Sequence, residues 1–133
     1  MRITQAVPFF AVSNIEKSVR WYIDLLGFSM KQSWTPEGKL QWCWLEIGDA
    51  ALMLQEFHTP REGKLGEGVS ICFICDDAVA FYREVKARGV DAKRPFVGNG
   101  MWVTSMTDPD GYRLDFESVT DVAEDTELED VTP

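Results

Sequence analysis

The sequence predicts an α+β protein made of two tandem βαβββ modules, whose curved mixed sheets surround a cleft and carry the helices on the outer face. Residue types recur at a constant separation of 62 along the 133 residues, which indicates a duplicated unit. Each half has one helical stripe of apolar residues, followed by short alternating segments between Gly, Pro and Asp turns. The length suits one domain and excludes a large multidomain enzyme.

The repeat extends across both halves at one offset. Its paired positions are Val7 and Val69, Val12 and Ile74, Asn14 and Asp76, Val19 and Phe81, Ile23 and Val85, Gly27 and Gly89, Leu52 and Leu114, and Leu54 and Phe116. We therefore predict one domain over 1–118, with module one at 4–56, a linker at 57–67 and module two at 68–118. Residues 119–133 are predicted to form a flexible acidic tail.

The first module opens with a predicted strand at 6–12, followed by a capping box in which Ser13 precedes Glu16 by three residues. A single helical stripe then contains Ile15, Val19, Tyr22, Ile23 and Leu26. Gly27 suits the left-handed conformation that ends a helix. Three strands are predicted to follow at 28–34, 40–47 and 51–56.

The second module repeats this order. It is predicted to contain a strand at 69–75, a helix at 78–88 capped by Asp77 and closed by Gly89, and strands at 90–94, 101–107 and 112–118. The segment Asp108-Pro109-Asp110-Gly111 is a strong turn signal between the last two strands, and we interpret it as structural.

Charge and cysteine content limit the possible partners. The chain has 22 Asp and Glu against 13 Lys and Arg, a formal net charge of −9, with the surplus concentrated after Ser118. The lack of a basic patch argues against nucleic acid and anionic membranes as partners. Cys43, Cys72 and Cys75 are odd in number and lie in apolar runs, so we interpret them as reduced, buried side chains of a cytoplasmic protein.

Strand alternation divides the side chains between a helix-facing side and a far side of each sheet. Leu114 and Phe116 suit the helix side, which turns Arg113, Asp115 and Glu117 to the far face. The far face of module one is predicted to hold Phe9, Trp42, Trp44, Glu46 and Met53, joined by Ile71 and Phe73 from module two. Exposed apolar surface costs about 25 cal/mol per Å², so we expect a ligand cleft or a second chain to cover this face.

Four segments carry a resemblance to a known superfamily. They are Val7-Pro8-Phe9-Phe10-Ala11-Val12, Ser18-Val19-Arg20-Trp21-Tyr22, Leu25-Leu26-Gly27-Phe28 and Asp108-Pro109-Asp110-Gly111-Tyr112. Over residues 4–118 the chain resembles the vicinal oxygen chelate superfamily, which includes glyoxalase I, extradiol dioxygenases, fosfomycin-resistance enzymes and bleomycin-resistance proteins. The resemblance implies the doubled βαβββ fold, whereas the chemistry differs among members.

In the metal-dependent members, the ligands are commonly two His and two Glu from the first and last strands of each module. The resemblance carries these positions onto Val7, Met53, Val69 and Asp115, of which only Asp115 can bind a cation. One carboxylate does not hold Zn²⁺, Ni²⁺, Fe²⁺ or Mn²⁺, which need three or four donors. We therefore expect neither a metal nor another cofactor.

The chain resembles the bleomycin-resistance branch more closely, through its Ala6-Val7-Pro8 opening and its missing metal ligands. That branch implies a homodimer that sequesters a planar, cationic small molecule in an aromatic cleft without a metal. The expected ligand-binding residues are Phe9, Trp42, Trp44, Glu46, Met53, Trp102, Arg113, Asp115 and Glu117. Trp102 has cleft-facing parity in this interpretation, and Arg113 would suit an anionic ligand instead.

Several alternatives stay open from sequence alone. The alternative to a binding protein is an enzyme. It would be a glyoxalase- or dioxygenase-like lyase or oxidoreductase, with a divergent metal site made of Asp115, Glu117 and His58. Asp115 is a candidate general base if burial raises its pKa, or it is neutralised by Arg113 or Arg94.

The aromatic and loop residues also have simpler interpretations. Trp42 and Trp44 form either a ligand platform or a core or dimer interface. Trp21 and Trp34 are interpreted as packing residues, His58 as an exposed loop residue and Glu56 as solvated.

Overall fold

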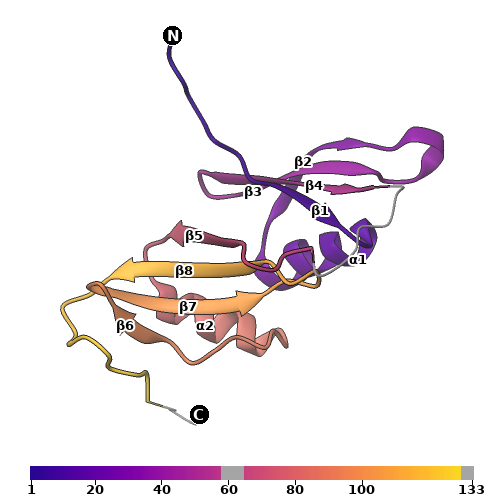
Figure 1. The fold of residues 1–133 in the computed structure, drawn as a ribbon. Coiled ribbons are helices and arrows are strands. Elements are labelled where there is room, and N and C mark those ends of the chain that lie inside the picture. Colours follow the sequence, from indigo (N-terminus) through magenta and orange to yellow (C-terminus); the bar gives the residue numbers. More distant parts are fainter. Residues whose placement is uncertain (58–64, 130–133) are drawn as a thin grey trace. The chain divides into compact units, whose positions relative to one another are not determined.

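The computed structural model describes residues 1–57 and 65–129. The chain divides into two compact units, one of residues 1–67 with 109–111 and one of residues 68–108 with 112–133. Each unit contains one four-stranded sheet and its own helical segment (Figure 1). The prediction of two βαβββ modules is confirmed.

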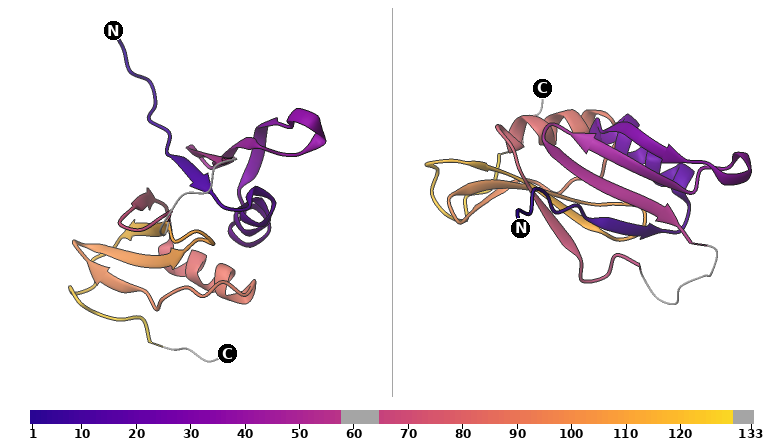
Figure 2. Two further views of the ribbon diagram at one scale, coloured as in Figure 1. Left: turned by 45° about the vertical axis from the view of Figure 1, so that its right-hand side comes forward. Right: turned by 90° about the horizontal axis from the view of Figure 1, so that it is seen from above.

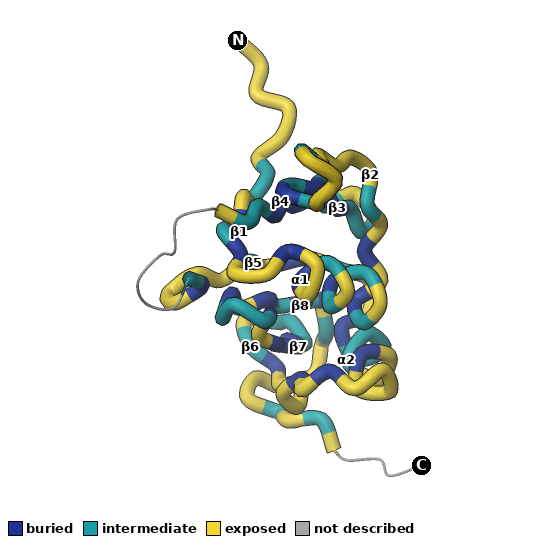
Figure 3. Tube along the Cα trace, turned by 90° about the vertical axis from the view of Figure 1, so that its right-hand side faces the viewer, coloured by how far each residue is buried: buried dark blue, intermediate teal, exposed yellow. Residues whose placement is uncertain are grey.

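The first sheet has the strand order β1-β4-β3-β2, with β1 parallel to β4 and the other pairs antiparallel. Its strands are β1 (Phe9–Val12), β2 (Ser29–Trp34), β3 (Trp42–Ile47) and β4 (Ala50–Glu56). The helical segments are α1 (Ile15–Arg20), the π-helix η1 (Trp21–Leu26) and the short 3₁₀ turn η2 (Pro36–Gly38). Strand β1 begins later than predicted because Pro8 has no N–H to donate to a neighbouring strand. Residues 1–6 before it are exposed (Figure 3).

The second sheet repeats this topology with the order β5-β8-β7-β6, and β5 is parallel to β8. Its strands are β5 (Ser70–Ile74), β6 (Phe96–Gly98), β7 (Met101–Thr107) and β8 (Arg113–Val119). Helix α2 (Ala78–Ala87) packs against β7 and β8 (Figure 2). The strand predicted at 90–94 is wrong: Val90 and Ala92 are buried after the helix, Lys93 N makes one backbone hydrogen bond to Ser105 O, and the strand ladder with β7 starts at Phe96. Pro95 has no N–H for the ladder, which delays that start.

The helix N-caps are Asn14 and Asp77. The Asn14 side chain accepts a hydrogen bond from Lys17 N at 3.1 Å, so the capping box predicted at Ser13 is wrong by one residue. The Asp77 side chain accepts from Ala80 N at 2.9 Å, as predicted. Asn14 therefore corresponds to Asp77 and not to Asp76, and the repeat offset before the helices is 63.

The offset returns to 62 at the glycines that follow the helices, Gly27 and Gly89, whose φ angles are 92° and 94°. The backbone bonds at these helix ends show the cause. Phe28 N donates to Tyr22 O, six residues earlier, whereas Val90 N donates to Val85 O, five residues earlier. Module one thus contains one extra residue in its helix, and the wider i→i+5 winding of η1 accommodates it.

The last strand of each module anchors its helix to the sheet. Ile15 N donates to Glu56 Oε1 at 3.2 Å, and Ala78 N donates to Ser118 Oγ at 2.8 Å. These acceptors satisfy the first N–H of each helix, which has no partner within the helix itself. Glu56 also pairs with Lys39 at 3.1 Å and has only 17% of its side chain exposed, so the expectation that it is solvated is wrong.

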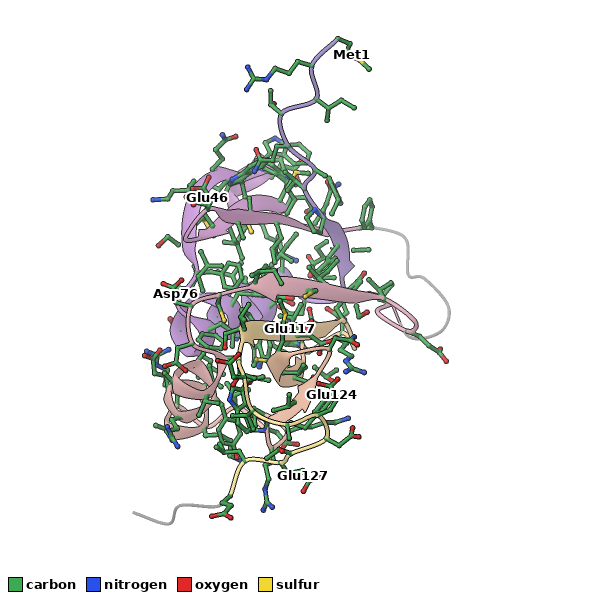
Figure 4. The ribbon with its side chains drawn as sticks, turned by 90° about the vertical axis from the view of Figure 1, so that its left-hand side faces the viewer. Met1, Glu46, Asp76, Glu117, Glu124 and Glu127 are labelled. Atoms are coloured by element: carbon green, nitrogen blue, oxygen red, sulfur yellow. The ribbon has the colours of Figure 1, made fainter. Side chains whose placement is uncertain are left out.

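Part of the predicted acidic tail is paired with the second sheet. Val97 N donates to Thr126 O, Asp125 N donates to Val97 O and Leu128 N donates to Pro95 O, each at 2.9 Å. The Glu124 carboxylate accepts from Asn99 N and Gly100 N in the β6–β7 turn (Figure 4). The structure therefore places residues 124–128 along β6, where the sequence predicted a flexible segment.

Candidate functional site

The far face of the first sheet is aromatic, as the strand alternation predicts. Along β3, Cys43 and Leu45 are fully buried on the helix side, whereas Trp42, Trp44 and Glu46 alternate with them and are half-buried. The helix side of β4 likewise contains Leu52 and Leu54, both fully buried, and leaves Met53 on the opposite face. The side chain of Phe9 is 49% exposed.

The strand register places these residues in two rows across the sheet. In the first row Phe9 pairs with Met53, Met53 with Trp44 and Trp44 with Gln32. In the second row Ala11 pairs with Gln55, Gln55 with Trp42 and Trp42 with Trp34. Paired residues of neighbouring strands share a face, so three tryptophans lie on this side of the sheet.

Trp34 lies on this face but is absent from the residues that the sequence predicts there. It was expected to be a packing residue, but 52% of it is exposed, and its partner in register is Trp42. Simple alternation could not reveal this position: Met30 pairs with helix-side Leu45, whereas Gln32 pairs with Trp44, so a register shift between Met30 and Gln32 turns Trp34 to the far face.

One hydrogen bond fixes the orientation of an indole on this face. Trp44 Nε1 donates to Glu46 Oε2 at 2.8 Å. Because the acceptor is ionised, this bond is stronger than one between neutral groups. It holds the indole edge of Trp44 beside a carboxylate, at the end of β3 that is marked by Glu46 in Figure 4.

The far face of the second sheet has a polar group around Asp115. Asp115 Oδ1 accepts from Ser105 Oγ at 2.5 Å and from Arg113 Nε at 2.9 Å. Neutralisation by Arg113, one of the alternatives left open by the sequence, is therefore the arrangement that the structure contains. The Arg113 side chain is 51% exposed and that of Asp115 is 16% exposed, so water screens the pair and its contribution to stability is small.

Three aromatic or apolar residues of module two lie on the helix side, which corrects their predicted position. Ile71 pairs with Leu114 and Phe73 with Phe116, and the Phe73 and Phe116 rings stack with their centroids 4.8 Å apart. Trp102 pairs with Ser118, whose hydroxyl accepts from the first residue of α2. Trp102 therefore shares the face of α2 and not the face of Asp115.

The cysteines differ in their surroundings. Cys43 is buried as predicted, and desolvation raises the pKa of its thiol to about 11. Cys72 is exposed, contrary to the prediction, and lies opposite Asp115 in the β5–β8 register. Local desolvation, a hydrogen bond to the Glu117 carboxylate and the negative charge of that carboxylate raise the pKa of the Cys72 thiol to about 12.

Comparison with known proteins identifies the family, because residues 2–116 match the model of a known superfamily. The chain belongs to the Glyoxalase/Bleomycin resistance protein/Dioxygenase superfamily. The lactoylglutathione lyase of Haemophilus influenzae is 28% identical over 114 residues, which cover 79% of this chain and 84% of that protein.

Solved structures share the fold of this superfamily member. TnmS3, an antibiotic binding protein from Streptomyces sp. CB03234, is 20% identical with a TM-score of 0.70, covering 90% of this chain and 100% of its own. A glyoxalase-related enzyme from Clostridium phytofermentans is 17% identical with a TM-score of 0.73, covering 90% of this chain and 97% of its own. Among the residues described, no helix is both long and apolar enough to cross a membrane.

The residues at the metal-ligand positions of the superfamily do not fit a metal ion. The resemblance placed these positions at Val7, Met53, Val69 and Asp115, and the β5 register moves the third of them to Ser70. Val, Met and Ser provide no carboxylate, thiolate or imidazole, and Asp115 is bonded to Arg113. Within 1–57 and 65–129 no three His, Cys, Asp or Glu side chains are grouped to hold a metal. His58 lies outside the described residues.

The raised pKa of Cys72 predicts slow alkylation despite the exposure of the residue. The thiolate is the reactive form, so lowering the pKa increases its fraction at a given pH. Replacing Glu117 by alanine removes both the hydrogen-bond acceptor and the negative charge, and should accelerate alkylation of Cys72 by iodoacetamide several-fold at pH 8. Glu84→Ala on the exposed side of α2 is the control, and peptide mass mapping separates Cys72 from Cys43 and Cys75. An unchanged Cys72 rate in Glu117→Ala would contradict this assignment.

Proposed function

We propose that this protein is a metal-independent binding protein that holds a planar small molecule against the aromatic far face of its first sheet. The observation that carries the proposal is the row of Phe9, Met53 and Trp44, flanked by Trp42. Aromatic rings gain about 0.5–1.5 kcal/mol from stacking on such side chains beyond the burial of their area. The antibiotic-binding activity named for TnmS3 supports the same class of function.

The charges on the described residues favour a ligand with a positive group. Glu46 accepts one hydrogen bond from Trp44 and places a carboxylate at the edge of the aromatic rows. A cationic ring over the tryptophans would gain both cation–π attraction and pairing with Glu46. The proposal retains Arg113, Asp115 and Glu117 as polar ligand contacts on the far face of the second sheet but omits Trp102, which lies on the helix side. It assigns no acid–base role to Asp115, because that carboxylate is bonded to Arg113 and Ser105.

The proposal also includes a homodimer and a cytoplasmic location. The three cysteines are free thiols, which suits a reducing compartment. If the aromatic face served only as a dimer interface, Trp42→Ala would dissociate the dimer in analytical ultracentrifugation without changing ligand binding. Loss of binding in a Trp42→Ala protein whose mass is unchanged would favour the ligand platform.

The binding proposal predicts that 9-aminoacridine, a planar cation with three fused rings, binds the purified protein and raises its Tm. Trp44→Ala should weaken this binding about tenfold in isothermal titration calorimetry, because it removes a stacking partner and the group that orients Glu46. Trp102→Ala is the matched control, since this tryptophan lies on the helix side of the other sheet. An absence of both binding heat and a Tm shift for the unmodified protein would refute the proposal.

A second candidate is favoured by the similarity to a lactoylglutathione lyase. In that case the protein is a glyoxalase- or dioxygenase-like lyase or oxidoreductase with a divergent metal site involving Asp115, Glu117 and His58. Elemental analysis of the purified protein tests it directly. A stoichiometric Zn, Ni, Fe or Mn content that is lost in Asp115→Ala would replace the first proposal by the second.

A further inference from the structure

An exposed tryptophan on an edge strand needs a physical explanation. Trp34 is the last residue of β2, and its exposed apolar surface is unfavourable in water. The neighbouring Lys31, Gln32 and Ser33 are exposed polar residues, as is usual for an edge strand. Trp34 is therefore an exposed aromatic side chain on a strand whose neighbouring exposed residues are polar.

The backbone of Trp34 is held firmly in place. Its carbonyl accepts from Gln41 N at 2.9 Å, and Gln41 itself is only 6% exposed. The Gln41 side-chain amide donates to the backbone carbonyl of Glu56. The backbone carbonyl of Gln41 in turn accepts from Glu56 N at 3.0 Å. The end of β2 is thereby tied through Gln41 to the end of β4, which preorganises Trp34 for a contact.

The spacing of the three tryptophans sets the size of ligand that suits them. The Cα atoms of residues directly paired across antiparallel strands lie about 4.5–5.5 Å apart. The Cα atoms of residues two apart on one strand lie about 6.5–7 Å apart. Trp42 therefore has Trp34 as its cross-strand neighbour and Trp44 as its neighbour along β3. A single six-membered ring covers one indole, whereas fused or linked rings reach two.

We infer that Trp34 extends the ligand platform to the sheet edge, so that the site takes planar ligands of two or more rings in preference to single-ring ligands. This inference rests on the proposed function, because it concerns the same face. In this inference Trp34 makes the site bind ligands of several rings more tightly than ligands of one ring. Trp44 contributes to the binding of all planar ligands.

A homologous series of planar cations tests the inference. The probes are 4-aminopyridine, 4-aminoquinoline and 9-aminoacridine, which are protonated at neutral pH and differ in the number of rings. In titration calorimetry, Trp34→Ala should weaken 9-aminoacridine about tenfold and 4-aminopyridine less than about twofold. Trp34→Phe should recover part of the loss. Ser33→Ala, at the residue that pairs with buried Cys43 on the other face, should leave all three affinities unchanged.

The outcomes separate this inference from the proposed function. Equal effects of Trp34→Ala on all three probes, or no effect on any, would overturn the role of Trp34 while the loss in Trp44→Ala still supports a binding face. A Trp34→Ala protein that loses only its dimeric mass would also overturn it, in favour of an interface between copies. Failure of the unmodified protein to bind any of the probes would overturn both.

Discussion

Replacing Phe73 by alanine is expected to lower the free energy of unfolding by about 3–5 kcal/mol, the usual range for removing a buried phenylalanine. Phe73 is 8% exposed and stacks on Phe116, whose ring also lies 4.3 Å from that of Phe81 on α2. The substitution would leave a cavity beside Phe116, whose ring would lose its stacking partner. Urea unfolding followed by circular dichroism measures the change.

The neighbouring Ile74 is the matched control. It is also apolar but is 67% exposed, because alternation turns it to the far side of β5. Ile74→Ala should change the free energy of unfolding by about 0.5 kcal/mol or less. If Ile74→Ala proved the more destabilising of the two, the orientation of β5 derived from its register with β8 would be wrong.

Strand orientation could be predicted from the sequence where polar and apolar residues alternate. Leu114 and Phe116 alternate with charged residues, and their helix-side position is confirmed by their burial. In β5 nearly every residue is apolar, so alternation gives no preference, and a one-residue error reverses the face. The constant repeat offset supplied that error, because it ignored the extra residue in the first helix.

Strand parity predicted the far-face positions of most candidate residues but misplaced Trp102, and it predicted none of their contacts. The far-face locations of Trp42, Trp44 and Met53 follow from strand parity alone. The ion-pair partner of Asp115 does not follow from alternation, because the sequence allows either Arg113 or Arg94. The exposed thiol of Cys72 likewise depends on the order of β5 and β8, which pairs residues more than 40 positions apart in the chain.

Helical periodicity also concealed the π-helix. The buried residues Ile15, Ser18, Tyr22 and Leu26 recur at spacings of three and four, as in an ordinary α-helix, so the pattern does not reveal the extra residue. The equivalent hydrogen bonds at the two helix ends reveal it, since they span six residues in module one and five in module two. The two helices should therefore differ in their tolerance to the deletion of one residue.

Deleting Asp24 from η1 is expected to give a folded protein with a cooperative unfolding transition. Asp24 is exposed and lies within the segment that contains the extra residue. Its removal allows the i→i+5 winding to become an ordinary α-helical turn, with Asn14 and Gly27 kept in the positions that Asp77 and Gly89 hold in module two. We expect a loss of no more than about 2 kcal/mol, within the range of ordinary single substitutions, because both helix caps are kept.

Deleting Lys86, the exposed residue at the corresponding place in α2, should have a much larger effect. This helix has no residue to spare, so each following position would turn by about 100° around the helix axis. Gly89 would leave its left-handed position and Val90, which is 5% exposed, would be drawn out of the core. We expect a loss of more than about 3 kcal/mol or no stable fold. Comparable stability of the two deletion proteins in urea would show that η1 does not contain an insertion.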